Sequence, residues 1–391
     1  MHSSTAMEHV RHLADVIGPR GSTTEGEARA AAYARDWFSG QGLEARVEPF
    51  RAPVSGWRPF AYASLLGLAS ALLFLVSGPW LSFALAAVML VTTVSMFSEM
   101  YFRPNLLSLL VRHAESRNVI ATLPAGSPSP ARRILIAAHL DTHRTPWAFT
   151  TPGRLAFFRI MTTLAVVAFI LSTLVYLTHG ITGWDWLRWS AAPLIPVLVT
   201  TFALTWQPDS TPHTVGANDN ASGAGVLLSL AARLAAEPLT HTEVTFLATG
   251  AEEVGSVGAK AYLDRHRGEL GNLSAISIDN VGGRGAGVCY TSMEGMVLPV
   301  RPSPELFGLA ERIRRELPAG SAYSLPYTTL HTDATCFMVY GVPSLSFVGL
   351  TPEGVIPDWH TAGDTVDKVD AAAVTANEEF VLRLLRTLDA Q

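Results

Sequence analysis

Two side chains with the chemistry of metal binding, His139 and Asp141, follow an apolar run at residues 134–136. Such a run is typical of a buried strand. Side chains alternate between the two faces of a strand, so the imidazole and the carboxylate point the same way. Open α/β sheets bind their ligands at the carboxyl ends of strands. A metal-bound histidine usually needs a second group to fix its tautomer, and Asp141 is placed to do this. Taken alone, such a pair is more often structural.

Further acidic and imidazole groups follow downstream. Asp219 lies in a glycine-rich turn before a predicted helix, where it could cap the helix or bridge two cations. Glu252 and Glu253 follow a predicted strand and precede a second glycine-rich turn; the alternative for them is a solvated pair at a helix start. Asp279 ends another predicted strand, and His360 lies in a loop.

Together these groups balance the charge of two divalent cations. Three carboxylates (Asp219, Glu253 and Asp279) and one hydroxide carry as much negative charge as two such cations carry positive charge, and an uncompensated buried charge would be costly. Imidazole and carboxylate ligands without a thiolate favour zinc. Two metals that share a water lower its pKa and polarise a carbonyl oxygen. Glu252 then remains as the general base, which passes the proton of the water to the leaving nitrogen.

These segments resemble a known family, the co-catalytic di-zinc aminopeptidases. This is family twenty-eight of the metallopeptidases, relatives of leucyl aminopeptidase and glutamate carboxypeptidase. The resemblance covers residues 1–56, 104–143 and 210–391. The matching segments are His139-Leu140-Asp141, Asn218-Asp219-Asn220-Ala221-Ser222-Gly223, Glu252-Glu253 with the glycines that follow, Asp279-Asn280-Val281-Gly282, residues 331–348, and His360-Thr361 with Asp364-Thr365.

The resemblance implies two Zn²⁺ ions, with Co²⁺ or Mn²⁺ as alternatives, and a peptide as substrate. It also assigns the ligands: His139 and Asp279 for one ion, Glu253 and His360 for the other, and Asp219 as the bridge.

The resemblance implies roles for three more residues. Glu252 would be the general base, Asp141 would orient His139, and Asp333 would support the site. Many relatives carry tyrosine before the last histidine, where its hydroxyl assists the developing oxyanion. This chain has Trp359 there, which could donate only an indole N–H.

The elements that must position these groups alternate between strands and helices, which predicts an α/β sheet with helices on both faces. With the resemblance, the expected fold is a three-layer α/β/α zinc-exopeptidase domain with a mixed central sheet. Strands are predicted at 43–50, 116–123, 134–136, 243–248, 275–278, 288–291 and 344–348, and helices at 5–17, 25–40, 223–236, 304–316 and 371–389.

Two charge-poor inserts interrupt this domain, at 57–103 and 144–209. Residues 59–98 contain no charged residue, and Gly78-Pro79 breaks that run into halves of about 20 residues, enough to span a bilayer. The stretches 160–184 and 189–208 also lack Asp, Glu, Lys and Arg. Hydrophobic residues make up 49% and charged residues 16% of the 391, fewer charges than soluble domains carry. We therefore predict two transmembrane hairpins, or four spans, and a lipid bilayer as partner.

Two hairpins make an even number of crossings, so all globular parts would share one side of the membrane. The positive-inside rule puts that side in the cytoplasm, and the N-terminus shows no signal-peptide apolar core. The protein would thus be a multi-pass integral membrane protein. Arginines flank the feet of the hairpins at positions 51, 58, 103, 112, 144, 154 and 159, whereas the tips carry only Arg188 beside Asp185.

Other classes of protein are disfavoured. The net charge of −5 and the lack of a basic block speak against a nucleic-acid partner, and two separated cysteines make no disulfide framework. The predicted spans lack the charged residues of a transporter. The expected activity is an aminopeptidase. The alternatives are a carboxypeptidase, a dipeptidase, a glutaminyl cyclase or a silent membrane scaffold. The sequence leaves substrate preference and oligomeric state open.

Overall fold

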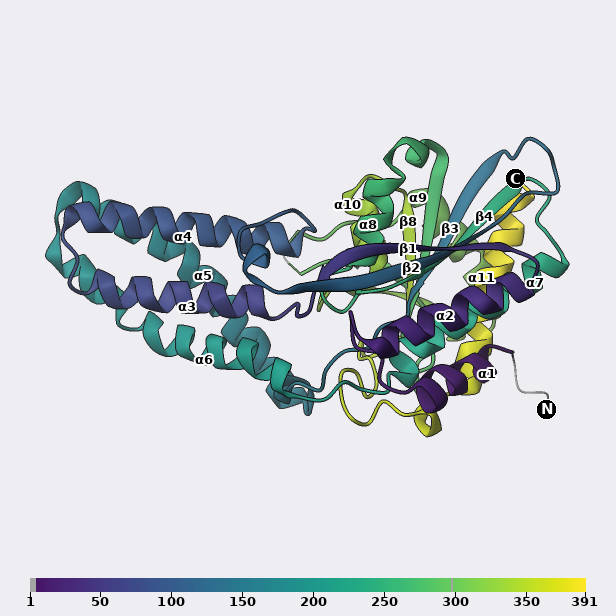
Figure 1. The fold of residues 1–391 in the computed structure, drawn as a ribbon, viewed down its shortest axis with the longest axis horizontal. Coiled ribbons are helices and arrows are strands. Elements are labelled where there is room, and N and C mark those ends of the chain that lie inside the picture. The colour runs from purple at the N-terminus through teal and green to yellow at the C-terminus, as the bar shows by residue number, and fades with distance from the viewer. Residues whose placement is uncertain (1–4, 297) are drawn as a thin grey trace. The chain divides into compact units, whose positions relative to one another are not determined.

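The protein, described here by a computed structural model for residues 5–296 and 298–391, forms two compact units (Figure 1). The first, which we call the sheet unit, consists of Met1–Ala52, Ala114–His143 and His213–Gln391. The second, the helical unit, consists of Pro53–His113 and Arg144–Pro212. Residues 1–4, which the sequence assigns to the first domain, lie outside the described residues.

An eight-stranded mixed sheet forms the centre of the sheet unit, in the order β1-β2-β4-β3-β5-β8-β6-β7. The four central strands β4, β3, β5 and β8 are parallel, and β2 and β6 join them antiparallel. The α/β fold with a mixed sheet, predicted from the sequence, is therefore confirmed. The strands are β1 (Glu44–Pro53), β2 (His113–Leu123), β3 (Arg132–His139), β4 (Thr242–Thr249), β5 (Leu273–Asp279), β6 (Val288–Glu294), β7 (Ala322–Tyr327) and β8 (Ser344–Val348).

Helices cover both faces of the sheet (Figure 1). On one face α1 (Thr5–Arg11), α2 (Glu25–Gly40) and α11 (Ala371–Asp389) pack on α7 (Gly223–Ala236), and α9 (Pro304–Arg315) packs on α11. On the other face α8 (Val257–Arg265) packs on α10 (Asp333–Val339), which contacts β3, β5 and β8. The core follows the strand alternation: Ile134, Ile136 and Ala138 of β3 belong to the same buried cluster as Leu227 of α7.

The parallel strands bring their carboxyl ends to one edge of the sheet. His139 ends β3, Asp279 ends β5, and Thr249 ends β4. In the register of the sheet His139 pairs with Thr249, so the turn after β4 begins beside that histidine. This is the edge at which an open α/β sheet binds ligands.

Two glycines let the loop before α7 approach its neighbours closely. A Cβ on Gly223 would lie 2.3 Å from the carbonyl oxygen of Ile278 in β5, and Gly216 has a φ of 57° with the side chain of Thr142 against it. A larger residue would push the loop that carries Asp219 away from the strand ends. The glycine-rich turn is therefore a packing requirement.

Helix bounds predicted from the sequence agree closely with the structure, whereas three elements were missed. The helices 25–40, 223–236 and 371–389 have the observed bounds, and 5–17 is α1 followed by a wider turn of π-helix (His12–Ile17). Strand β7 contains Pro326 and lies at the edge of the sheet, where proline is tolerated. Helices α8 and α10, with nine and seven residues, are too short for a clear periodic pattern.

Four main helices make up the helical unit: α3 (Arg58–Phe74), α4 (Pro79–Met100), α5 (Pro152–Thr182) and α6 (Leu194–Trp206). Gly78 precedes Pro79, the first residue of α4, so the break between α3 and α4 lies where the sequence predicts it. Pro193 immediately precedes α6. Three helical segments in the described residues are long and apolar enough to cross a membrane: Pro79–Met100, Pro152–Thr182 and Asp185–Ser210. Helix α3 is apolar but has 17 residues, so four spans remain a prediction.

Buried polar side chains join the two hairpins where each turns. The hydroxyl of Ser82 lies 2.8 Å from the hydroxyl of Ser77 and 2.8 Å from Nδ1 of His179. His179 belongs to the second hairpin, and its Nε2 lies 4.0 Å from Asp185, which pairs with Arg188 at 2.6 Å. Hydrogen bonds between apolar helices of this kind hold membrane bundles together.

Candidate metal centre

The carboxyl ends of β3 and β5 and the loop before α7 bring one imidazole and two carboxylates together. Nε2 of His139 lies 3.3 Å from Oδ1 of Asp219 and 3.3 Å from Oδ1 of Asp279. Nδ1 of the same ring lies 3.1 Å from the backbone oxygen of Asp141, which fixes the ring. All three side chains are buried. Two carboxylates that lie 80 and 140 positions after His139 in the chain thus converge on one nitrogen of its ring.

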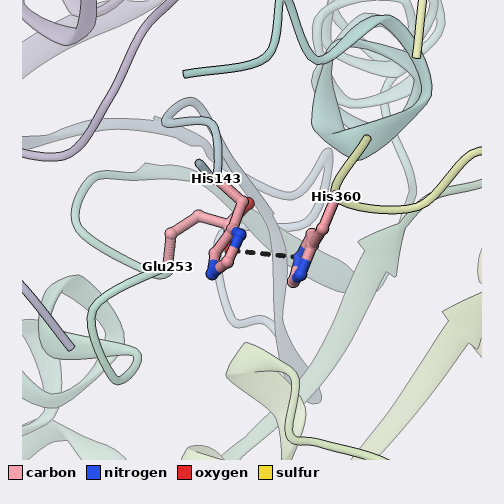
Figure 2. Close-up of side chains that lie close together, drawn as sticks. All are labelled: His143, Glu253 and His360. Atoms are coloured by element: carbon pink, nitrogen blue, oxygen red, sulfur yellow. Dashed lines mark ion pairs between the residues drawn. The ribbon is translucent and has the colours of Figure 1, made fainter. Parts of the chain in front are cut away.

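The second histidine approaches the other oxygen of the same carboxylate. Nε2 of His360 lies 3.1 Å from Oδ2 of Asp219. The same nitrogen lies 3.4 Å from Oε2 of Glu253 (Figure 2). Asp219 therefore stands between the two histidines with one oxygen toward each. This is the arrangement that a carboxylate bridging two cations requires.

Charge and burial oppose each other in this cluster. Burial alone would raise the pKa of Asp219, but contacts with His139 and His360 outweigh it and hold that pKa below its usual range. Burial raises the pKa of Glu253 to about 8, and the charge of Asp219 adds to the rise. Burial also raises the pKa of Asp279. Positive charge beyond the two imidazoles would relieve this crowding of carboxylates.

Neighbouring polar groups hold the ligand-type carboxylates in place. The carboxylate of Asp364 accepts hydrogen bonds from the backbone N–H groups of Asn218 (2.6 Å) and Asp219 (3.0 Å), which fixes the loop. The side-chain amide of Asn280 donates to Oδ1 of Asp279 at 2.8 Å. The peptide bond between Asp219 and Asn220 is cis.

Asp141 holds the turn after β4 as well as lying beside His139. Its carboxylate accepts hydrogen bonds from the backbone N–H groups of Glu252 and Glu253, at 3.1 Å each, and from the hydroxyl of Ser22 at 2.5 Å. The nearer carboxylate oxygen is 3.6 Å from Nδ1 of His139, farther than the Asp141 backbone oxygen. The Asp141 carboxylate therefore orients the backbone of the two glutamates.

Glu252 and Asp333 form a second group of acids behind the ligand-type residues. Burial raises the pKa of Glu252 well above its ordinary value; His139 opposes the rise, whereas Asp333 and Glu253 add to it. Burial raises the pKa of Asp333 to about 6, and its Oδ2 accepts a hydrogen bond from the hydroxyl of Thr249 at 2.6 Å. A carboxyl group whose pKa is raised in this way suits proton transfer near neutral pH.

A buried arginine ties the loops of this site to the N-terminal helix. Arg20 is 1% exposed, and its guanidinium donates hydrogen bonds only to backbone carbonyl oxygens, at 2.8–3.0 Å. One acceptor, Leu140, lies between His139 and Asp141. The other acceptors are Leu13 and Gly18 beside the N-terminal helix and Val215 and Gly216 before Asp219.

The residues fit a pair of divalent cations by their donor chemistry and by their unsatisfied oxygens. Oδ2 of Asp219 and Oε1 of Glu253 are buried and accept no hydrogen bond from any described residue. Such oxygens need a cation or donor, because burying a bare carboxylate is costly. Ligand atoms of His139, Asp219 and Glu253 lie within 4.8 Å of one another, as do those of His143, Glu253 and His360. Imidazole with carboxylate is a zinc donor set.

Two residues near this cluster were not identified from the sequence. His143 stacks on His360, and the same alternation that places Asp141 beside His139 would have predicted it. Tyr327 ends β7, and burial followed by the charges of Asp279 and Asp219 raises its pKa well above the ordinary value. It lies outside the motifs that the sequence analysis singled out, although it precedes Asp333 by only six residues. Trp359 lies against His360, with ring centroids 4.2 Å apart.

Comparison with known sequences finds one family model that matches part of the chain. The sequence profile of Peptidase family M28 matches residues 208–385, which include Asp219, the two glutamates, Asp279 and His360. Over this segment the chain is similar to peptidase family M28. Aminopeptidase YwaD of Bacillus subtilis is 46% identical over 56 residues, which is 14% of this chain and 12% of that relative. The aligned segment thus spans about one eighth of the relative's length.

Solved structures of the same fold are zinc exopeptidases and glutaminyl cyclases. A zinc aminopeptidase from Bacillus subtilis aligns with a TM-score of 0.58 and 15% identity, over 99% of this chain and 95% of that chain. A Zn-dependent exopeptidase from Parabacteroides distasonis gives 0.58 and 14%, over 98% of each chain. A glutaminyl cyclase from Porphyromonas gingivalis gives 0.58 and 14%, over 99% and 98%. At these identities the likeness establishes the fold, as the sequence predicts.

The network of Arg20 makes a prediction about the stability of the sheet unit. Arg20→Met removes the side-chain donors to five carbonyl oxygens. Those of Leu13 and Gly216 keep backbone N–H donors, whereas those of Leu140, Gly18 and Val215 lose the arginine donor, and each orphaned group costs about 1–3 kcal/mol. We expect the thermal midpoint of the sheet unit to fall by roughly 10 °C and zinc affinity to fall with it. Arg20→Lys keeps the charge but has only three donors, so its loss should be smaller. Hydrogen exchange of residues 140–143 and 214–219 measures the local effect.

Arg29→Met is the matched control, because Arg29 donates to a single carbonyl, that of Ile17 at 3.1 Å. Its midpoint should fall by no more than a few degrees. Equal stability of the Arg20→Met and Arg29→Met proteins would contradict the structural role given to Arg20.

Proposed function

We propose that this protein is a membrane-anchored zinc peptidase that removes residues from the amino-terminal end of peptides. The observation that carries the proposal is the position of Asp219 between two imidazoles, with Oδ1 near His139 and Oδ2 near His360. His139, Asp279, Glu253 and His360 would hold two zinc ions around that bridge. Zinc bound there would polarise the scissile carbonyl and lower the pKa of a water.

Glu252 is the general base of the proposed reaction. It takes a proton from the attacking water as the new carbon–oxygen bond forms, and it gives that proton to the leaving nitrogen as the peptide bond breaks. Its backbone N–H is held by Asp141 at 3.1 Å, and its Oε1 accepts a hydrogen bond from the hydroxyl of Ser256 at 3.1 Å. These contacts aim the carboxyl group, and its raised pKa suits both steps.

Tyr327 is a candidate donor for the oxyanion that develops on the carbonyl. Burial and the charges of Asp279 and Asp219 keep its hydroxyl protonated, so it can donate a hydrogen bond. This would supply the assistance that Trp359, in place of the usual tyrosine, offers only through an indole N–H.

Glutaminyl cyclase activity is the second candidate, because cyclases share this fold. We favour the peptidase because both Glu253 and Asp219 are present beside His360, which supplies ligands for a second ion. Carboxypeptidase and dipeptidase activities use the same type of site. A peptide-library digest with zinc-loaded protein separates the alternatives by which bond is cut and which end must be free.

The helical unit is proposed to lie in a bilayer. Its surface carries many exposed apolar side chains, and its interior holds polar hydroxyl groups beside apolar ones, an arrangement that suits a bilayer better than water. Exposed side chains include Leu72, Leu90, Val94, Ile160 and Leu174, whereas buried ones include Ser64, Ser70, Ser82, Thr92 and Thr201. At the foot of the unit Arg58 pairs with Asp209 at 2.5 Å and lies over the ring of Trp206 at 3.5 Å, a contact suited to the membrane–water interface.

The assigned base predicts the behaviour of Glu252→Gln. The amide keeps the shape and the hydrogen-bonding contacts but cannot accept the proton, so kcat should fall by about 10²–10⁴-fold. Zinc content by mass spectrometry should equal that of the unaltered protein, because Glu252 is not a proposed ligand. Glu269→Gln, an exposed substitution in the same unit, is the control and should change neither quantity. Near-normal turnover of the Glu252→Gln protein would refute the assigned base.

The proposed orientation predicts where fused reporters end up. Because two hairpins return the chain to its starting side, a reporter at the C-terminus should be cytoplasmic, and one inserted after Gly78 or Gly183 should lie on the far side. Protease accessibility in sealed vesicles measures both. A C-terminal reporter on the far side would contradict the cytoplasmic location of the sheet unit.

A further inference from the structure

His143 lies in the sheet unit on a stretch of backbone that is fixed on two sides. Its backbone oxygen accepts a hydrogen bond from Thr214 at 2.9 Å. The preceding residue, Thr142, exchanges backbone and side-chain hydrogen bonds with Arg20, at 3.2 and 3.0 Å. Successive side chains of an extended backbone point to opposite faces, so those of His139, Asp141 and His143 lie on the same face. The position of the His143 ring is thus set by the backbone that also carries His139.

The ring of His143 lies face to face with that of His360 (Figure 2). The two ring centroids are 3.6 Å apart and the planes differ by 12°. His143 is 6% exposed, and a nitrogen of its ring lies within 4.8 Å of both a Glu253 carboxylate oxygen and a His360 nitrogen. It therefore stands beside the proposed second metal position without belonging to the five-ligand set.

The stacked arrangement distinguishes between two roles for the His143 ring, a metal ligand or a neighbour that positions His360. Imidazole lone pairs lie in the ring plane, so two stacked rings direct theirs along parallel lines that do not converge. An ion in the plane of His360 lies one stacking distance from the plane of His143, and 3.6 Å between centroids exceeds a zinc–nitrogen bond of about 2.1 Å. His360 is the ring that aims Nε2 at Asp219 and Glu253. His143 is thus not a second imidazole ligand in this arrangement.

We propose that His143 is a positioning residue that fixes the plane of the His360 ring and so strengthens binding of the ion held by His360 and Glu253. This inference rests on the proposed function, because it presupposes a metal at that position. The flat ring of His143 restricts rotation of the His360 ring about its Cβ–Cγ bond. Such a rotation would swing Nε2 away from the two carboxylates. The groups that orient a ligand in this way typically change metal affinity by about 10–100-fold when removed.

The inference predicts a difference between two substitutions of similar volume. His143→Phe keeps a flat ring but has no nitrogen, whereas His143→Leu fills the space without a flat face. The matched control is His12→Leu, because His12 stacks on Tyr33 with a centroid distance of 4.0 Å and a 16° angle, among residues that do not belong to the site. The full chain in detergent is loaded with Zn²⁺ or Co²⁺ for each variant.

Three measurements are made: ions bound per chain, affinity for each ion by chelator competition, and the visible absorption of the cobalt-loaded protein. We expect His143→Phe to bind two ions with affinities within about 3-fold of the unaltered protein and with an unchanged cobalt spectrum. His143→Leu should bind one of the two ions, the one proposed to be held by His360 and Glu253, about 10–100-fold less tightly, and His12→Leu should match the unaltered protein.

Two results would overturn the inference. If His143→Phe also loses an ion and changes the cobalt spectrum, His143 is a ligand. If His143→Leu binds both ions as His12→Leu does, His143 does not position His360. If the unaltered protein does not bind two ions, that result would contradict the proposed function itself, and the inference would fail with it.

Discussion

The structure depends on the compensation of negative charge that is buried at one edge of a sheet. Asp219, Glu253 and Asp279 meet around two imidazole nitrogens, with Asp141, Glu252, Asp333 and Asp364 directly behind them. Without added positive charge these carboxylates would repel one another and would keep their protons to higher pH, as the raised pKa of Glu253 indicates. Two divalent cations would remove that conflict, and every other feature of the site keeps the ligands in reach of them.

Rigid strands hold part of this group of charged side chains in place. Parallel strands β3 and β5 carry His139 and Asp279 at their ends, so the spacing of the sheet sets their separation. The remaining groups come from loops, which need their own restraints. Arg20 ties two loops to the N-terminal helix through backbone carbonyls, Asp364 holds the Asp219 loop, and Asp141 holds the two glutamates. Polar groups outside the proposed ligand set thus decide where the proposed ligands lie.

The sequence predicted the parts of this arrangement that follow from short-range pattern. Helix α7 and strand β5 follow from periodicity, and the motifs around Asp219 and Glu253 follow from glycines beside acids. The resemblance to a di-zinc peptidase family could also be recognised from the sequence, because five ordered motifs are specific as a set, and a family model matches residues 208–385. Arg20 was missed because its partners are backbone atoms far along the chain, which leave no trace in side-chain pattern. The detailed role of Asp141 and the position of Tyr327 likewise depend on tertiary contacts. His143 could have been predicted, because it continues the every-second-residue spacing of His139 and Asp141.

Anomalous diffraction at the zinc edge from crystals of the zinc-loaded protein tests the central claim most directly. The account predicts two peaks about 3.5–4 Å apart, one about 2.1 Å from Nε2 of His139 and the other about 2.1 Å from Nε2 of His360, with the Asp219 carboxylate between them. A single peak, or peaks that do not contact Asp219, would contradict it.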